Sequence, residues 1–442
     1  MATDLLSIAR SGARAAKAGL DVTAQNIANA SSTGYVRRSI AVSELAASSA
    51  SSSPTATTLA GVRITGVVRN ADVYRQAEVR RTGADAARAN AEVEGLESIE
   101  SAVEQTGVYD SIVDFEAGLQ QLVSDPTDGS LRAAVIEQSR TLAQTFNTAA
   151  SSLDAVGEGL RFEAQDGVDN VNRITTELAR LNLSLSRTTG DQTSLLDQRD
   201  ALLEELSGQV GISTSFDAKG AVSVTLGGSS GPSLVSGSTA GTLAMTAASD
   251  GTISFTLDGN AATVASGAIA GKSQALAEVA STRGQLDAIA AQIVSVVNAA
   301  QANGVDLQGN TGQPMFSGTG AADMAMVATS GNAIATAPAG SAANSRDGSN
   351  LASLRTALSS TDPAGSMDTL LFGISSAVAG RTVTRDALDS VATTAKSALQ
   401  AQAGVDLDEE AVNLVRFQQA FQASGRVMQT ASEIFDSILS IR

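Results

Sequence analysis

The stretch that decides the fold is Asn26–Arg38, with the sequence NIANASSTGYVRR. It ends a region of helical periodicity. It is also rich in turn-forming residues, because serine, threonine and asparagine offer side-chain hydrogen bonds to the backbone and Gly34 can adopt a positive φ. We therefore predict that a helix over residues 4–29 stops here and that the chain then turns away. The role of that helix can be judged only together with the sequence at the other end of the chain.

The predicted helix over residues 4–29 carries a row of mostly small side chains. Its two glycines each lower the intrinsic helix propensity by about 1 kcal/mol relative to alanine, so the helix is weak alone and needs a partner. Small side chains would let a partner helix approach closely. The row advances by alternating steps of four and three, and Ile27 widens it: Leu5, Ala9, Gly12, Ala16, Gly19, Thr23 and Asn26.

The last helix of the chain carries a matching row of large side chains. Rows of this kind are the seams of paired helices, and a large seam complements a small one sterically. Such a stripe is either ordinary intramolecular core or a surface for neighbouring molecules, and its place at the end of the chain raises the second alternative. The row consists of Leu414, Phe417, Phe421, Ser424, Met428, Ala431, Phe435 and Ile438.

Between the two ends, the pattern changes several times. Alternating residues over 37–45 and 61–69 predict a β-hairpin. Residues 72–206 are mostly helical, with a turn at Asp125–Pro126, an N-cap at Asp128 or Ser130, and a separate helix over 171–187. Residues 208–266 are rich in Gly, Ser and Thr with short alternating runs, which predicts one small all-β insertion, and helical pattern returns at 272–302. The fold class is mainly α with a β insertion, that is, α+β.

The composition excludes several function classes. The 442 residues carry 46 acidic and 29 basic side chains, so the net charge of −17 argues against nucleic acid and against an anionic membrane surface as partners. The absence of cysteine and histidine excludes disulfides, thiolate chemistry, the usual zinc sites and every histidine-based triad. No run of eighteen apolar residues predicts a membrane span, and the N-terminus lacks the apolar core of a cleaved signal peptide.

Three motifs suggest chemistry and are better explained without it. The segment Ser266–Leu276 looks like a phosphate loop, but only three residues separate Gly267 from Gly271 where four are needed, so we read it as the exit from the β insertion with Ser273 as a possible N-cap. Adjacent Glu409 and Glu410 suit the first turn of a helix, where they complement its dipole. The segment Asp306–Gly312 lacks the acidic ladder of a calcium loop, so we read it as a tight turn. We predict no catalytic, cofactor-binding or metal-binding residues.

The stretch NIANASSTGY resembles the N-terminal motif of the flagellar axial protein family, which comprises rod, hook and hook-associated proteins and whose motif is usually written NNIANANTPGY. The segment Ser31–Thr33 replaces the usual Asn-Thr-Pro, and Arg37 resembles the hook-associated branch, whereas rod and hook proteins more often continue with a lysine. The C-terminal segment 404–439 is very similar to that branch, and segments 195–207 and 297–316 resemble its interior. The matching motif residues are Asn26, Ile27, Ala28, Asn29, Ala30, Gly34 and Tyr35.

The resemblance implies a structural axial protein, not an enzyme, at the junction between hook and filament of the bacterial flagellum. It implies an extracellular location reached through the flagellar type III export channel without a cleaved signal peptide. The implied partners are further copies of the chain, the hook protein, the next junction protein and an export chaperone at the C-terminal region, with no cofactor.

The resemblance also implies a nested domain organisation. Residues 1–36 with 400–442 would form an inner coiled-coil domain, 37–207 with 267–399 a helical middle domain with the hairpin, and 208–266 an all-β outer domain. The expected assembly residues are Leu5, Ala9, Gly12, Ala16, Asn26, Ile27, Asn29, Gly34, Tyr35, Leu414, Phe417, Phe421, Met428, Phe435 and Ile438.

Two other functions remain as alternatives. The first is a hook or distal-rod protein, against which Arg37 and the interior segments argue. The second is a secreted enzyme carried on an axial-protein scaffold, which would need a pocket with converging polar groups that the sequence does not offer.

Overall fold

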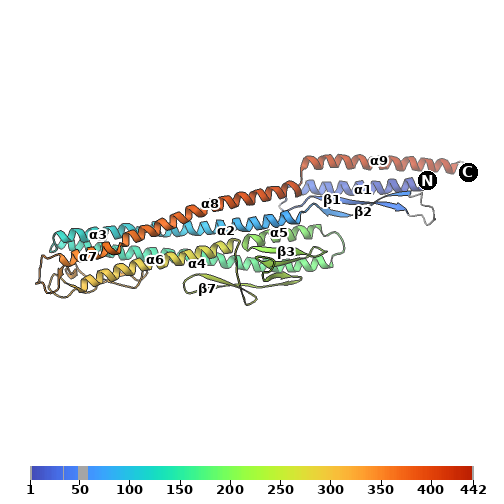
Figure 1. Ribbon diagram of the computed structural model, residues 1–442. Coiled ribbons are helices and arrows are strands. Elements are labelled where there is room, and N and C mark those ends of the chain that lie inside the picture. The colour runs from blue at the N-terminus through green and yellow to red at the C-terminus, as the bar shows by residue number, and fades with distance from the viewer. Residues whose placement is uncertain (1, 33, 48–57, 441–442) are drawn as a thin grey trace. The chain divides into compact units, whose positions relative to one another are not determined.

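The computed structural model describes residues 2–32, 34–47 and 58–440; within these ranges, the side chains of 2–4, 46–47, 58–60 and 438–440 lie outside the description. The described chain is mainly helical with small antiparallel sheets, which confirms the predicted fold class (Figure 1). It divides into two compact units. Unit 1 comprises 1–83, 172–242 and 390–442, and unit 2 comprises 84–171 and 243–389.

Unit 1 holds both ends of the chain. Helix α1 (Ala2–Asn29) contacts helix α9 (Leu407–Ser440), and the two lie side by side in Figure 1. The predicted hairpin is confirmed as β1 (Arg38–Ala47) and β2 (Thr58–Arg69), which pair antiparallel from Arg38 opposite Arg69. The hairpin also contacts α1, and the hydroxyl of Ser11 accepts a hydrogen bond from the backbone N–H of Val62 at 3.2 Å.

Unit 1 also contains helix α5 (Thr193–Gln209) and a four-stranded sheet in the order β3 (Ile212–Phe216), β4 (Val222–Leu226), β5 (Ser233–Ser236), β6 (Thr239–Ala240). In β4, alternate side chains are buried, as expected for a strand with one face on a core. Asn182 of helix α4 (Gly129–Arg187) fastens the sheet, because its amide bonds both the N–H and the C=O of Val222 and also the C=O of Gly237.

Unit 2 is a helical bundle around a continuous aliphatic core. Its helices are the later part of α2 (Val73–Glu104), α3 (Val108–Ser124), the first part of α4, α6 (Ala268–Ala302), α7 (Ser349–Thr361) and most of α8 (Pro363–Ala403). Proline suits the first position of α8, where a backbone N–H would have no partner in the helix.

The remaining elements of unit 2 are short. One three-stranded sheet contains β7 (Leu243–Ala247), β8 (Ile253–Leu257) and β9 (Asn260–Ala262). Two two-residue pairs and a 3₁₀ turn follow α6: β10 (Gly304–Val305) with β13 (Ala337–Pro338), β11 (Phe316–Ser317) with β12 (Ala325–Met326), and η1 (Gly331–Ala333). The ring of Phe316 meets that of Phe115 edge-on at 6.0 Å between centroids, which joins this loop region to the helical core.

Three local predictions are corrected or resolved by the structure. The helix expected over 171–187 is not separate, because α4 continues unbroken from Gly129 to Arg187. The glycine at 157 does not interrupt it, since this buried residue packs near Val279 of α6 and the contact compensates for poor helix propensity. Asp128 is the N-cap of α4, accepting from the N–H groups of Ser130 and Leu131. Ser273 is not an N-cap but lies inside α6.

The strands within 208–266 form two separate sheets. The four strands up to Ala240 belong to unit 1, and the three strands from Leu243 belong to unit 2. Hairpin turns join β3 to β4 and β7 to β8 within this segment. Period-two alternation predicts strands but carries no information on which strands share a sheet, so the division could not be read from the sequence.

Arg132 in α4 is a fully buried cation bonded only to neutral acceptors. Its guanidinium donates to the carbonyls of Pro126 (2.6 Å), Gly331 (2.9 Å) and Ile334 (2.9 Å) and to the hydroxyl of Thr336 (2.8 Å). This one side chain therefore holds the start of α4 and the turn around η1 together within unit 2.

We predict that Arg132→Met lowers the free energy of unfolding by about 3 kcal/mol, because three buried carbonyls lose their donor. Urea unfolding followed by circular dichroism should show an earlier transition. The control is Arg140→Met in the same helix, whose pair with Glu137 is exposed and should contribute less than about 1 kcal/mol. Equal midpoints for the two variants would contradict the assigned role of Arg132.

Candidate assembly site

The contact between α1 and α9 depends on two glycines of α1. A Cβ placed on Gly19 would lie 2.6 Å from the ring of Phe417, and one on Gly12 would lie 3.1 Å from the hydroxyl of Ser424. Because contacts under 3.0 Å are too close for a real Cβ atom, Phe417 occupies space that only glycine leaves open. The small seam of α1 thus receives the large seam of α9.

The structure places the other predicted seam residues of α1 as follows. Ala9, Ala16, Thr23 and Asn26 are buried, and they share the buried side of α1 with Ala13 and Val22, which is consistent with cover from both α9 and the hairpin. In contrast, Leu5 and Ile27 are exposed.

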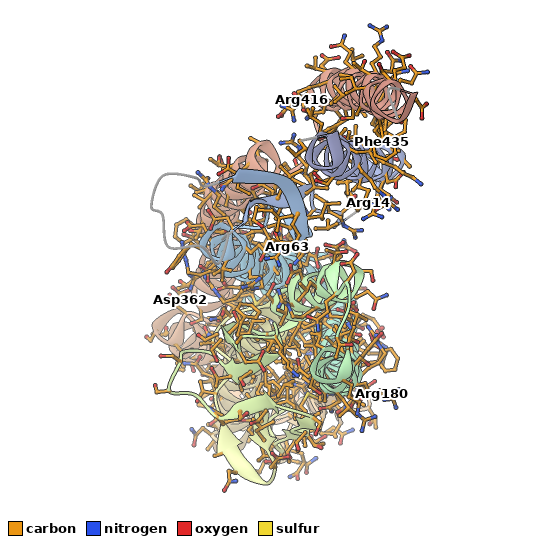
Figure 2. The ribbon with its side chains drawn as sticks, turned by 90° about the vertical axis from the view of Figure 1, so that its right-hand side faces the viewer. Arg14, Arg63, Arg180, Asp362, Arg416 and Phe435 are labelled. Carbon is orange, nitrogen blue, oxygen red and sulfur yellow. The ribbon has the colours of Figure 1, made fainter. Side chains whose placement is uncertain are left out.

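Most large residues of α9 remain partly in water. Leu414, Phe417 and Met428 are half-buried, and Ala431 is buried. Phe421 and Phe435 are 44% and 47% exposed, respectively. The side chain of Ile438 lies outside the described residues. Figure 2 looks along the helix pair, with Arg416 and Phe435 labelled on α9 and Arg14 on α1.

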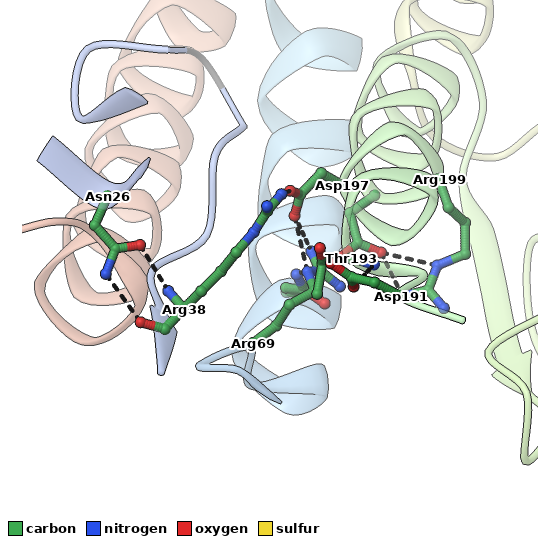
Figure 3. Close-up of polar contacts among 9 residues, drawn as sticks. Asn26, Arg38, Arg69, Asp191, Thr193, Asp197 and Arg199 are labelled. Atoms are coloured by element: carbon green, nitrogen blue, oxygen red, sulfur yellow. Dashed lines mark hydrogen bonds and ion pairs between the residues drawn. The ribbon is translucent and has the colours of Figure 1, made fainter. Parts of the chain in front are cut away.

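Asn26 closes the turn after α1. Its side-chain amide donates to the C=O of Arg38 at 2.9 Å and accepts from the N–H of Arg38 at 3.0 Å, so it pairs with that residue as a neighbouring strand would (Figure 3). The same oxygen accepts from the hydroxyl of Tyr35 at 2.9 Å. Gly34 has φ of 78°, a conformation that glycine adopts without strain. The side-chain amide of Asn29 donates to the C=O of Gln25, one turn earlier in the same helix.

Arg37 fixes the start of α9 to this turn. Its backbone N–H donates to the C=O of Ala403, and its guanidinium pairs with Glu410 at 2.7 Å and with Glu409 at 2.9 Å. Glu409 and Glu410 do lie in the first turn of α9, as predicted from the helix dipole. Glu410 is also buried, so it is a structural partner of Arg37 and not only a dipole charge.

Beneath the base of the hairpin lies a buried group of ion pairs, part of which Figure 3 shows. Arg38 and Arg69, opposite each other in the hairpin, both pair with Asp197 of α5 at 2.7 Å. Arg69 also pairs with Asp200 at 2.8 Å, and Asp200 pairs in turn with Arg199 at 2.6 Å. The hairpin is therefore held on α5 by shared carboxylates.

The pKa values of Asp200 and Tyr35 are perturbed. Burial alone would raise the pKa of Asp200, but the adjacent Arg199 and Arg69 outweigh it and hold that pKa below its usual value. Burial raises the pKa of the Tyr35 phenol, partly offset by Arg38. The Asp200 carboxyl group is therefore ionised in the folded protein near neutral pH.

The motifs that suggested chemistry are accounted for by packing. Gly267 has φ of 87° and begins α6, and Gly271 is so close to the C=O of Arg88 that a Cβ would lie 2.2 Å from it. Lys272 pairs with Glu163 at 3.0 Å. Asp306 accepts from two backbone N–H groups of its own turn, as expected for the tight turn predicted there. The described residues contain no cluster of acidic side chains that could hold a metal ion.

Comparison with known proteins gives the family. The model of the flagellar hook-associated protein FlgK helical domain matches residues 93–316, about half of the chain. The model of the flagellar basal body rod FlgEFG protein C-terminal matches residues 397–441. The chain belongs to the flagellar hook-associated protein 1 family.

Full-length relatives agree. Flagellar hook-associated protein 1 of Bacillus subtilis is 25% identical, and the match covers 98% of this chain and 97% of that protein. The Escherichia coli protein of the same name is 26% identical over 71% of this chain, but the match covers only 60% of its own length. The flagellar hook junction protein FlgK from Burkholderia pseudomallei shares the fold over 55% of this chain and 46% of that protein, with a TM-score of 0.50 and 24% identity.

Membership of the hook-associated protein 1 family makes the chain a structural component of the extracellular flagellum and not an enzyme. Within the described residues, no helix is both long and apolar enough to cross a membrane.

Sequence reasoning missed the ion pairs under the hairpin. Arg38, Arg69, Asp197 and Asp200 were not among the predicted assembly residues. A signal was present, because the two arginines bracket the hairpin and the segment LLDQRD (195–200) was one of those that resembled the hook-associated branch. Nothing in the pattern, however, indicated that α5 lies against the hairpin.

The α1–α9 register can be tested with an engineered disulfide, since the chain has no cysteine of its own. We predict that Gly12→Cys with Ser424→Cys forms a disulfide on mild oxidation, because a Cβ at position 12 lies 3.1 Å from the Oγ of residue 424. Non-reducing electrophoresis would show the faster-migrating band. Gly12→Cys with Gly425→Cys is the control, since no atom lies within 4 Å of a Cβ at 425. The register is wrong if the control pair closes as readily.

Asp200 should make the free energy of unfolding depend on pH in the acidic range. A carboxylate whose folded pKa is lowered stabilises the fold above its unfolded pKa of about 3.9 and loses that contribution as the pH falls through the lower folded pKa. We predict that Asp200→Asn destabilises the protein by about 3 kcal/mol at pH 7, because Arg199 keeps no carboxylate partner. The variant should also lose less stability than the wild type between about pH 4 and pH 2.

Thermal unfolding at pH 7 and between about pH 4 and pH 2 measures both effects. Asp21→Asn, which removes an exposed carboxylate of α1, is the control and should follow the wild-type curve. A wild-type curve and an Asp200→Asn curve of the same slope would show that Asp200 does not couple proton binding to folding.

Proposed function

We propose that the chain forms a layer of the junction between hook and filament, in which the α1–α9 pairs of neighbouring subunits pack on one another. The observation that supports this is the set of large apolar side chains left in water along the helix pair. These residues, on α1 and α9 respectively, are Leu5, Leu6, Ile8 and Ile27, and Leu407, Val412, Val415, Phe421, Val427, Ile434 and Phe435.

Burial of this surface would be the main driving force of assembly. Apolar surface is stabilised by about 25 cal/mol for each Å² removed from water, and fully burying one large side chain contributes about 1.5–3 kcal/mol. The contact between α1 and α9 itself buries mostly alanine and glycine on the α1 side, which contribute little area. Neighbouring subunits therefore supply the stabilisation that the isolated pair lacks.

The proposed partners follow from the family. They are further copies of this chain, the hook protein on one side, the next junction protein on the other, and an export chaperone at the C-terminal region during passage through the flagellar type III channel. The relatives are named for association with the hook. A weak terminal helix pair suits export, because the ends can be unfolded at little cost before they meet their neighbours.

The nested organisation remains our proposal for the assembled state. Residues 1–36 with 400–442 would form the inner domain, 37–207 with 267–399 the middle domain, and 208–266 the outer one. The contact of α1 with α9 supports the first of these.

A hook or distal-rod subunit is the second candidate function. The observation that favours it is the match of residues 397–441 to a rod-protein C-terminal model. The larger match of residues 93–316 to the hook-associated helical domain favours the junction. Immunogold microscopy of the isolated hook decides between them, since the junction places the label at its distal end.

We predict that Phe421→Asp abolishes incorporation into flagella while the chain is still secreted. In the free chain this side chain is 44% exposed, so the new carboxylate stays hydrated and the melting temperature should change little. In an assembled layer it would be buried without a partner, which costs several kcal/mol. Motility and immunogold labelling report incorporation, and immunoblots of culture medium report secretion.

Phe421→Leu is the matched control, because it keeps an apolar side chain at the same position. It should assemble. Normal labelling of the hook end by Phe421→Asp, or a melting temperature lowered by many degrees in the free variant, would show that Phe421 is ordinary intramolecular core.

A further inference from the structure

Unit 1 contains a crevice of about 470 Å³ beside the turn that follows α1. It is bordered by that turn, by α2, by α5 and by the end of α8, all within the same unit. Its polar lining includes Tyr35, Gln76, Arg80, Asp200, Glu204, Lys396 and Gln400.

Arg80 is the feature of the crevice that lacks an explanation. The residue is only 5% exposed, and its Nη2 donates to the hydroxyl of Thr214 at 3.1 Å. Among the described residues, no carboxylate oxygen lies within 4 Å of its guanidinium, although an arginine offers five N–H donors. Burial lowers its pKa, and the nearby carboxylates of Asp200 and Glu204 offset this effect only in part.

The neighbouring charged side chains already form ion pairs with one another. Asp197 and Asp200 pair with Arg38, Arg69 and Arg199, and Glu204 pairs with Lys396 at 3.0 Å. Of the four charged residues that line the crevice, Asp200, Glu204 and Lys396 therefore have oppositely charged partners, whereas within the described part of the chain Arg80 has none within 4 Å.

We propose that the crevice receives an aspartate or glutamate side chain from a neighbouring copy of this chain, which pairs with Arg80. A carboxylate matches the planar guanidinium and can accept two parallel hydrogen bonds from it. The chain carries 46 acidic residues, so a second copy brings this chemistry wherever copies adjoin. The inference rests on the proposed assembly of many copies, and it adds a specific polar contact to the apolar packing of α1 and α9.

Site-specific photo-crosslinking tests the proposal in assembled flagella. A benzophenone amino acid at Gln400, an exposed residue of the crevice lining, should give a covalent dimer of this chain on irradiation. The crosslinked peptide should contain an aspartate or glutamate within one helical turn of the attachment point. Arg80→Gln should reduce the dimer at least fivefold, whereas Arg80→Lys, which keeps the charge, should retain most of it.

A separate variant distinguishes pairing with a neighbour from a role inside the chain. Thr214→Val removes the hydrogen bond that the Arg80 guanidinium donates to the Thr214 hydroxyl and should leave the dimer yield unchanged. Melting temperatures of the purified variants identify any loss that comes from misfolding. A dimer that is insensitive to Arg80→Gln, or a crosslink only to another protein, overturns the proposal.

Further outcomes show whether the carboxylate bound in the crevice is a free ion or belongs to a neighbouring copy. They also distinguish failure of this inference from failure of the proposed function. If sodium acetate raises the melting temperature of the wild type but not of Arg80→Gln, and no dimer forms in flagella, the crevice binds a free carboxylate and the pairing between copies is wrong. If immunogold labelling finds the chain at the hook end without an Arg80-dependent dimer, only this inference fails. If the chain is absent from the hook end, the proposed function fails and this inference with it.

Discussion

The structure of unit 1 depends on how closely α1 and α9 approach each other. Gly19 leaves the space that Phe417 fills, so the first and last helices of the chain can lie in contact. A single added methyl group at Gly19 would force the ring of Phe417 to move. The chain segment between the two helices therefore leaves α1 and enters α9 at one place, next to the base of the hairpin. The turn at Asn26 and the pair Arg37–Glu410 are the local devices that make this possible.

The ionic and the apolar contacts of unit 1 differ in how completely they are formed. The apolar contact of the two terminal helices is incomplete, with Phe421 and Phe435 left in water, whereas the hairpin is fixed on α5 by almost fully paired ions. Buried ion pairs add little net stability over well-packed apolar groups, but breaking one partner is costly, so they tolerate few alternative arrangements. The helix pair therefore keeps apolar surface available for the proposed neighbouring subunits, while the hairpin beside it is already fixed in place.

Sequence reasoning succeeded where a periodic pattern or a local motif determines the structure. The small seam of α1, the hairpin, the N-cap at Asp128 and the fold class all follow from spacing and residue type. It failed where the outcome depends on tertiary contacts. The sequence pattern did not show that the helix expected over 171–187 is the last part of a longer one, α4, which begins at Gly129. Alternation does not show which strands share a sheet, so the two sheets within 208–266 could not be told apart. Glu410 suits the helix dipole, but its pair with Arg37 could not be foreseen because Arg37 is hundreds of residues away in sequence.

The pairing of the two termini has a consequence for the length of the chain. Since α1 and α9 bring both ends of the intervening segment to one point, that segment is a closed loop whose closure entropy grows only with the logarithm of its length. Doubling the loop costs about 0.6 kcal/mol. Insertions between the terminal helices are therefore thermodynamically cheap so long as the α1–α9 contact is kept.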